Sequence, residues 1–328
     1  DATAWMAMYC LDLLRIALEL AEENSAYEDL ASKFFEHFLY IAHALHDPDA
    51  DSRLAPWCER EGFYFDLLKT PAGEDHIPLR SLVGLIPLFA VHVIPAKQYE
   101  KLPNFRRRKV WFLERHPQFA EAVTERHDGG WVLTGVTRSR LERVLAQLFD
   151  EQKFLSPYGP RSLSKEHEAR PVRTRLPDGR VLEVRYEPGE RQTRMKGGNS
   201  NWRGPVWWPA GYMLYRSLLR LEHGFGQSIR VRDHRGEPRW SLGEAAHELG
   251  ERMLAIFERG PDGKRPVYGD EALFQADPHF RDHVLFYEYF HGDTGLGLGA
   301  SHQTGWTALA GDMALRQDRL RNGGEPGG

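Results

Sequence analysis

Three segments of the chain combine carboxylates, aromatic rings and arginine in a way that a packed core would not select. The first, residues 197–209, reads Gly-Gly-Asn-Ser-Asn-Trp-Arg-Gly-Pro-Val-Trp-Trp-Pro. Its glycines permit tight turns, and Pro205 suits the first turn of a helix. Trp202, Arg203 and Trp207 would then project at the N-terminal end of that helix. We interpret this segment as a binding loop, because a capped helix entry alone would not need so many bulky and polar side chains.

The second segment, residues 285–295, places one carboxylate, Glu288, among four aromatic side chains. Such surroundings desolvate a glutamate and raise its pKa, which suits a catalytic acid or base. Three histidines lie nearby, His283, His291 and His302, but their spacing matches no usual zinc motif. We therefore expect ordinary loop histidines there and no metal ion.

The third segment is the opening run Asp1-Ala-Thr-Ala-Trp. An aspartate just ahead of a helix is most often an N-cap or a partner of the helix dipole, and spacing alone favours that interpretation of Asp1. Asp66, which follows Tyr64 and Phe65, has two interpretations of equal weight. It is either an acceptor for ligand hydroxyls or an exposed carboxylate at a strand end.

The elements that must position these residues are mostly helices. Apolar residues recur at helical spacing in eight segments, with long loops rich in aromatic residues and glycine between them. The predicted helices cover residues 2–23, 26–46, 79–93, about 105–117, 139–149, 205–222, 241–259 and about 301–316. A strand-like run covers 62–68, and residues 172–176 and 181–186 flank a Pro-Asp-Gly turn that predicts a β-hairpin within a charged insertion, 168–196. The sum predicts one all-α layered domain over 1–328, with its function in the loops.

Composition excludes several classes of protein. The 328 residues carry a formal charge of −4, whereas a dedicated nucleic-acid surface usually needs a basic excess. The longest apolar run, 82–94, is too short to span a bilayer and is interrupted by glycine, proline and histidine. The two cysteines cannot form a disulfide framework. Aromatic residues make up 12% of the chain. Core packing explains most of them, and stacking against sugar rings is the functional alternative.

Taken together, the three motifs resemble a known family. Asn201-Trp-Arg-Gly-Pro-Val-Trp207, Glu288-Tyr-Phe-His-Gly-Asp-Thr-Gly295 and Ser301-His-Gln-Thr-Gly-Trp306 are similar to the C-terminal catalytic region of glycoside hydrolase family 63. That family includes processing α-glucosidase I, bacterial α-glucosidases and mannosylglycerate hydrolases. The opening helix and two further segments, 62–66 and 154–162, look like its bacterial branch.

The resemblance implies an (α/α)6 toroid, or six-hairpin barrel, and an exo-acting hydrolase that inverts the anomeric carbon of an α-glucosidic or α-mannosidic bond. By similarity, Asp1 matches the general acid and Glu288 the general base, while Trp202 and Arg203 line the glycosyl subsite. The other residues expected to bind substrate are Gly204, Trp207, Asp66 and Trp306. The substrate would be an oligosaccharide or a small glycoside, with no cofactor, nucleic acid or membrane involved.

Eight helices are fewer than the twelve of such a toroid, so the sequence predicts a barrel that is incomplete at its N-terminus. The missing N-terminal part of the same polypeptide would then be its partner, and the chain alone would be poorly active. Two other classes stay open. One is a helical carbohydrate-binding module that has lost catalysis, and the other is an interaction domain that docks on a partner. The sugar, its linkage, the oligomeric state and the compartment stay undecided, with a cytoplasmic location favoured over secretion.

Overall fold

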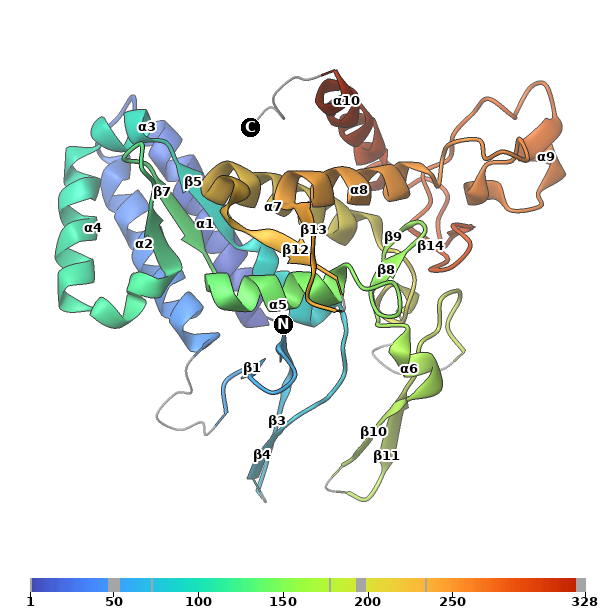
Figure 1. The fold of residues 1–328 in the computed structure, drawn as a ribbon, viewed down its shortest axis with the longest axis horizontal. Helices are drawn as coiled ribbons and strands as arrows, with labels where there is room; N and C mark the ends of the chain where they lie inside the picture. Colours follow the sequence, from blue (N-terminus) through green and yellow to red (C-terminus); the bar gives the residue numbers. More distant parts are fainter. Residues whose placement is uncertain are drawn as a thin grey trace. The chain divides into compact units, whose positions relative to one another are not determined.

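The computed structural model describes residues 2–46, 54–71, 73–176, 178–192, 199–233 and 235–322 (Figure 1). Its contacts divide the chain into two compact units, and each is described by itself. The N-terminal unit comprises Asp1–Leu79, Val83–Val144 and Arg220–Arg230. The C-terminal unit comprises Arg80–Leu82, Leu145–Leu219 and Val231–Gly328.

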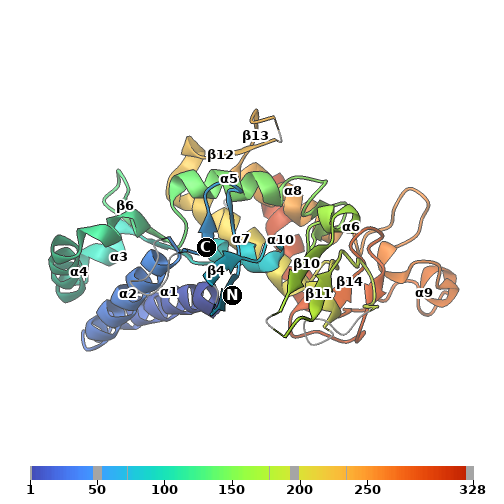
Figure 2. The same ribbon diagram turned by 90° about the horizontal axis from the view of Figure 1, so that it is seen from below.

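In the N-terminal unit two long helices, α1 (Ala2–Ala21) and α2 (Tyr27–Ala44), lie side by side (Figures 1 and 2). Their small and apolar residues recur every three or four positions and are buried, which is the reason these segments form paired helices. Two further helices follow, α3 (Ala96–Glu100) and α4 (Pro103–Arg115), and α4 packs on α2. The Phe35 and Phe105 rings meet edge to face at this contact, with centroids 5.7 Å apart.

The sheet of this unit is antiparallel and has the strand order β5-β7-β6. Its strands are β5 (Val91–Ile94), β6 (Val123–Glu125) and β7 (Trp131–Thr134), and a 3₁₀ turn at Pro117–Ala122 leads into β6. Two short hairpins complete the unit. They pair β1 (Trp57–Cys58) with β2 (Phe63–Tyr64), and β3 (Leu67–Thr70) with β4 (Gly73–His76).

The predicted helix over 79–93 is wrong. The segment is a 3₁₀ helix at Leu82–Phe89 followed by strand β5. Pro87 removes a backbone donor that an α-helix needs. Beyond it, Val91 and Val93 pair with β7, where branched side chains pack well.

The C-terminal unit contains the end of α5 (Arg138–Leu148), most of α7 (Trp208–Phe225), then α8 (Leu242–Leu254) and α10 (Ala310–Arg321). A capping box of Ser241 and Glu244 starts α8. Short helices occur at α6 (Glu166–Ala169) and α9 (Ala272–Ala276), and 3₁₀ turns at Ser200–Trp202, Pro266–Tyr268 and Thr307–Leu309.

Four two-stranded hairpins connect these helices. They pair β8 (Leu155–Ser156) with β9 (Gly159–Pro160), β10 (Val172–Arg175) with β11 (Val181–Val184), β12 (Arg230–Arg232) with β13 (Pro238–Ser241), and β14 (Tyr289–Phe290) with β15 (Gly297–Leu298). The hairpin expected at 172–186 is therefore present, as β10 and β11.

The expected fold class, an all-α (α/α)6 toroid, is wrong. The described residues form seven small sheets besides the helices, so the chain has a mixed α/β fold. The strands of the described residues are two to four residues long, which is too short for an alternating pattern to distinguish them from loops. No helix among the described residues is long and apolar enough to cross a membrane.

Candidate functional site

Hydrogen bonds join three stretches of the C-terminal unit: the tryptophan loop (197–209), the Glu288 segment (285–295) and the closing segment that contains Trp306 (301–307). Val206 and Phe290 exchange both backbone hydrogen bonds, at 2.8 and 2.9 Å, which ties the tryptophan loop to the Glu288 turn. The Gln303 N–H donates to the Phe286 carbonyl at 2.7 Å, and the Thr307 hydroxyl donates to the Tyr287 carbonyl at 2.7 Å. Residues far apart in the sequence therefore form one cluster, which we call the tryptophan–glutamate cluster.

Three of the predicted binding residues form its aromatic part. The rings of Trp202 and Trp207 have centroids 5.2 Å apart, and those of Trp207 and Trp306 are 6.2 Å apart and nearly perpendicular. All three side chains are half-buried. The indole nitrogens of Trp207 and Trp306 have no hydrogen-bond partner among the described residues. These two nitrogens are themselves buried, whereas the partly exposed ring surfaces suit a ligand with apolar faces.

Glu288 supplies a half-buried carboxylate to the same cluster. The Asn201 Nδ2 donates to its Oε1 at 3.4 Å, and Asn201 itself is 3% exposed, so this donor is held in place by the loop. Gly299 has a φ of +70°, and a Cβ there would lie 2.8 Å from the Glu288 Oε2. A larger residue at position 299 would therefore clash with the Glu288 carboxylate.

A second carboxylate, Glu190, approaches from the segment after β11. The Tyr289 hydroxyl donates to the Glu190 Oε2 at 2.8 Å, and the Ser200 hydroxyl donates to the same oxygen at 3.2 Å. Burial raises the pKa of Tyr289 to about 12, with a further contribution from the charges of Glu190 and Glu288. Tyr289 is thus a phenol close to two carboxylates, and it stays a hydrogen-bond donor at neutral pH.

Arg203 is fully buried, and its Nη2 lies 2.9 Å from the Oε2 of Glu187, which is 5% exposed. Burial lowers the pKa of Arg203. The Glu187 N–H donates to the Arg203 carbonyl at 2.7 Å, so backbone and side chains both join these two segments. Gly204, also buried, has a φ of +143°, and a Cβ there would come within 2.7 Å of Tyr186. Arg203 and Gly204 therefore shape the loop that carries Trp202 and Trp207.

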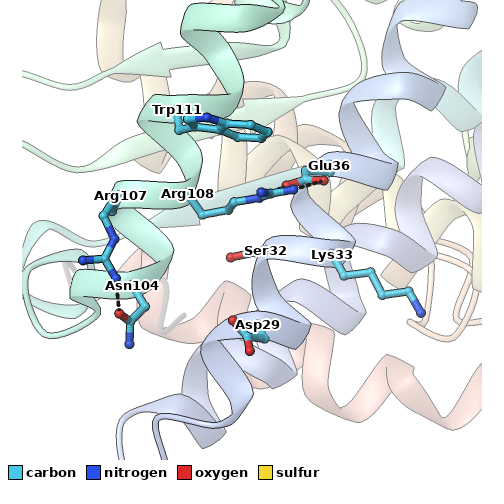
Figure 3. A pocket seen from close by; sticks show the side chains of 8 residues that line it. All are labelled: Asp29, Ser32, Lys33, Glu36, Asn104, Arg107, Arg108 and Trp111. Carbon is cyan, nitrogen blue, oxygen red and sulfur yellow. Dashed lines mark hydrogen bonds and ion pairs between the residues drawn. The ribbon is translucent and has the colours of Figure 1, made fainter.

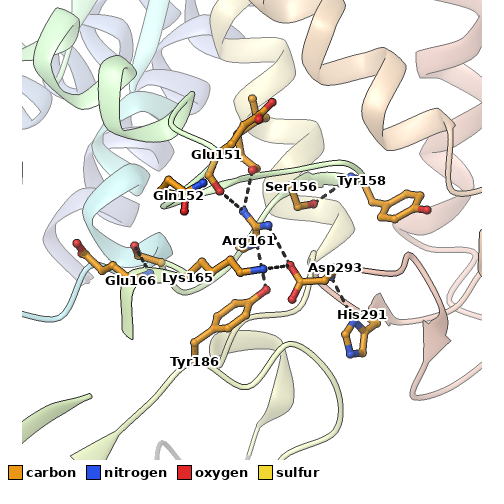
Figure 4. Close-up of polar contacts among 12 residues, drawn as sticks. Glu151, Gln152, Ser156, Tyr158, Arg161, Lys165, Glu166, Tyr186, His291 and Asp293 are labelled. Carbon is orange, nitrogen blue, oxygen red and sulfur yellow. Dashed lines mark hydrogen bonds and ion pairs between the residues drawn. The ribbon is translucent and has the colours of Figure 1, made fainter. Parts of the chain in front are cut away.

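The turn after Glu288 is anchored by Asp293 (Figure 4). The buried Arg161 donates to Asp293 Oδ1 at 3.0 Å and to the Tyr186 hydroxyl at 3.0 Å, and the Lys165 ammonium donates to the same aspartate oxygen at 3.2 Å. Burial by itself would raise the pKa of Asp293, but the hydrogen bonds from Arg161 and Lys165 hold it below its ordinary value. At neutral pH the anchor is an ionised carboxylate between two cations.

Two predicted site residues remain, Asp1 and Asp66. Asp1 lies outside the described residues. Asp66 is exposed and belongs to the N-terminal unit, where its carbonyl accepts a hydrogen bond from the Ile77 N–H at 2.9 Å. Their roles stay predictions.

Sequence reasoning missed Glu187, Glu190 and the anchor at Asp293 as site residues. Both glutamates lie in Glu187-Pro-Gly-Glu190, within the charged insertion, 168–196, to which we assigned only a β-hairpin. The signal that could have found them is the proline–glycine turn, since it breaks the hairpin pattern between two acidic residues.

A cavity of about 600 Å³ in the N-terminal unit has a different character (Figure 3). It lies between α2 and α4, and it is lined by Asp29, Ser32, Lys33, Glu36, Asn104, Arg107, Arg108 and Trp111. Arg108 donates to Glu36 at 2.5 Å and stacks on the Trp111 ring, 4.2 Å from its centroid. This surface carries two acidic and three basic side chains, a mixture that is ordinary for exposed helix faces. No group of three or more His, Cys, Asp or Glu side chains suited to a metal ion occurs among the residues that the structure describes.

Comparison with known proteins supplies a relative but no function. No protein-family model matches the chain. The chain is 42% identical over 327 residues to the uncharacterized protein YMR196W of Saccharomyces cerevisiae. The match covers 94% of this chain and 30% of the yeast protein, so the chain spans less than a third of the length of that relative.

Proposed function

We propose that the tryptophan–glutamate cluster binds a sugar and that the chain is an inverting glycoside hydrolase acting on an α-glucosidic or α-mannosidic bond. The observation that carries this proposal is the position of Glu288. Its carboxylate accepts a hydrogen bond from Asn201, and Asn201 lies on the loop that also carries Trp202 and Trp207. A half-buried carboxylate beside flat aromatic rings is the arrangement that hydrolysis of a sugar acetal requires. The resemblance to glycoside hydrolase family 63 supports the same assignment.

In this mechanism Glu288 is the general base. It takes a proton from a water molecule as the water oxygen attacks the anomeric carbon, while an acid protonates the departing glycosidic oxygen. The bond from carbon to the leaving oxygen breaks as the bond to water forms on the opposite face, so the product has the inverted anomeric configuration. The Asn201 hydrogen bond holds one oxygen of the Glu288 carboxylate in place.

Two carboxyl groups compete for the role of the acid. The resemblance assigns it to Asp1, whereas Glu190 is the second carboxylate beside Tyr289. In an inverting enzyme the carboxyl groups of the acid and the base are roughly 6.5–9.5 Å apart. The acid must therefore be the candidate, Asp1 or Glu190, that lies at this distance from Glu288 across the bound sugar. We assign the acid to Asp1, because Glu190 is already engaged by two hydroxyl donors.

The test is turnover of α-glucosides and α-mannosides by the full chain, with the first-formed anomer identified by proton NMR. A β-configured sugar released from an α-linked substrate is the expected result. Glu288→Gln should lower kcat by about 10²–10⁴-fold, because the base is lost while its shape is kept. Glu168→Gln, at an exposed glutamate of the same unit, is the matched control and should leave kcat unchanged.

Replacement of the two candidate acids completes the test. Asp1→Asn should abolish turnover of substrates with poor leaving groups, whereas Glu190→Gln should reduce it only modestly. The reverse order would move the acid to Glu190. Sugar binding without turnover, unaffected by Glu288→Gln, would favour a carbohydrate-binding module. Absence of any sugar affinity would favour an interaction domain and overturn the proposal.

A further inference from the structure

A separate polar cluster lies between helices α7 and α10 of the C-terminal unit. The Tyr212 hydroxyl donates to Asp312 Oδ2 at 2.5 Å, and the Arg316 Nε donates to the same oxygen at 2.7 Å. Arg216 and Tyr215 face the same group of charges, since both interact electrostatically with Arg316 and Asp312. We call these five residues the α7–α10 cluster.

Two donors of this cluster have no acceptor among the described residues. They are the Tyr215 hydroxyl, on a side chain that is 0% exposed, and the Nη1 of Arg216. Burying a hydroxyl or a guanidinium nitrogen without an acceptor is costly, because water no longer solvates it. Unsatisfied donors of this kind call for an acceptor from outside the chain, and each such group in a native fold needs an explanation.

The charges of the cluster favour an anionic acceptor. Within the cluster, two guanidinium groups, Arg216 and Arg316, face one carboxylate, Asp312. Burial lowers the pKa of Arg216, so its charged form is under-stabilised as the chain stands. The side chain of Asp312 is 38% exposed, so the cluster is open to solvent on that side.

We propose that Tyr215, Arg216 and Arg316 form a binding site for a small oxyanion, a phosphate or carboxylate group. A guanidinium matches two oxygens of such a group, and a phenol can donate to a third. The anion oxygens would accept from the two donors that otherwise lack an acceptor, the Tyr215 hydroxyl and the Arg216 Nη1.

This site is distinct from the tryptophan–glutamate cluster. Arg216 lies eight residues after Trp208, the first residue of α7. At a rise of 1.5 Å per residue that separation is about 12 Å along the helix. The proposal therefore does not depend on the sugar site, and either can fail while the other stands.

The experiment is thermal unfolding of the full chain in increasing concentrations of inorganic phosphate near pH 7, with sodium chloride at equal ionic strength as the reference. Phosphate should raise the midpoint in a saturable way beyond the effect of the chloride. Arg216→Gln should weaken the apparent phosphate affinity by about tenfold or more, since it removes a charged donor. Tyr215→Phe should weaken it by about threefold to tenfold, since it removes a neutral one.

Tyr215→Phe also separates loss of the phosphate site from loss of folding, because it preserves the packing of the ring. In the absence of phosphate this variant should be at least as stable as the parent, since it removes an unpaired buried hydroxyl. Arg319→Gln, at an exposed position of α10, makes the same charge change as Arg216→Gln and should leave the phosphate response unaltered. Equal responses to phosphate and chloride, or an unchanged response in both Arg216→Gln and Tyr215→Phe, would overturn the proposal.

A third arm decides whether the anion is free or is carried on a sugar. Glucose 6-phosphate replaces inorganic phosphate, and Trp207→Ala is compared with the parent chain. Tighter binding of the sugar phosphate, with the extra affinity lost in Trp207→Ala, would assign the anion to a ligand that reaches both sites. Equal binding of the two probes, unaltered by Trp207→Ala, would assign a free anion.

Discussion

The two units handle buried charge differently. In the N-terminal unit Glu28, 2% exposed, accepts three hydrogen bonds at the start of α4: from the Asn104 N–H at 2.8 Å, from Asn104 Nδ2 at 3.0 Å and from the Phe105 N–H at 2.9 Å. In the C-terminal unit Glu288 is only half-buried and is held by Asn201 at 3.4 Å. A carboxylate with well-aligned donors stabilises a fold, whereas one that keeps acceptor capacity can serve a ligand.

The same contrast holds for the cations. Lys109 of α4 is 1% exposed, and its ammonium lies over the Trp131 ring, 2.8 Å from the centroid, with Tyr99 as a second ring. Arg203 of the C-terminal unit is as deeply buried but faces a carboxylate, Glu187. Aromatic faces partly replace water around a buried ammonium, while a buried guanidinium needs an anion. The contact of Lys109 with Trp131 stabilises the packing of α4, and the ion pair of Arg203 with Glu187 stabilises the loop of the candidate site.

The largest expected effect comes from separating the buried pair. Arg203→Met should lower the free energy of unfolding by about 3–5 kcal/mol, because it leaves the Glu187 carboxylate buried without a counter-charge. The double variant Arg203→Met, Glu187→Met should recover most of that loss. Urea unfolding followed by tryptophan fluorescence measures both.

Sugar affinity separates the two possible roles of Arg203. If this arginine only positions the loop, the double variant should regain affinity along with stability. Recovered stability without recovered affinity would show instead that Arg203 contacts the sugar directly.

The next effect tests the structural carboxylate. Glu28→Ala should cost about 2–4 kcal/mol of unfolding free energy, because the Asn104 and Phe105 donors at the start of α4 lose a charged acceptor. Glu23→Ala, at an exposed position in the turn after α1, should change stability by less than about 0.5 kcal/mol. If Glu28→Ala changed stability as little as Glu23→Ala does, Glu28 would not be a structural carboxylate, and the contrast with Glu288 would be lost.

The smallest effect is a pH dependence. Burial lowers the pKa of Lys109 from its ordinary 10.5 to about 7, while the charge of Glu125 opposes the shift. Between these values the unfolded chain binds a proton that the folded chain does not, so this lysine makes stability rise with pH. The expected contribution is at most about 1 kcal/mol per pH unit, because the Trp131 and Tyr99 rings favour the cation.

Urea unfolding at about pH 7.5, 8.5 and 9.5 compares the parent chain with Lys109→Met, which should lose this slope. A parallel pH dependence in the two proteins would mean that Lys109 stays protonated over the aromatic rings throughout this range.

Much of the helical framework could be predicted from the sequence. The helices expected at 2–23, 26–46 and 241–259 correspond to α1, α2 and α8, because a sustained apolar stripe reports a helix that buries one face. The hairpin at β10 and β11 was predicted from its turn. The strands of the β5-β7-β6 sheet were not, because short segments acquire their pairing from partners distant in the chain.

Of the candidate site, the sequence by itself determined the chemical content: the tryptophans of the loop, Glu288 in its aromatic turn, and the glycines that let both segments bend. Only the tertiary structure decided that Arg203 meets Glu187, that Glu190 binds Tyr289, and that Arg161 and Asp293, 132 positions apart, anchor the turn. The physical reason is that residue type and spacing set local conformation, whereas the partner of a buried charge is whichever group the packed chain brings within hydrogen-bond distance.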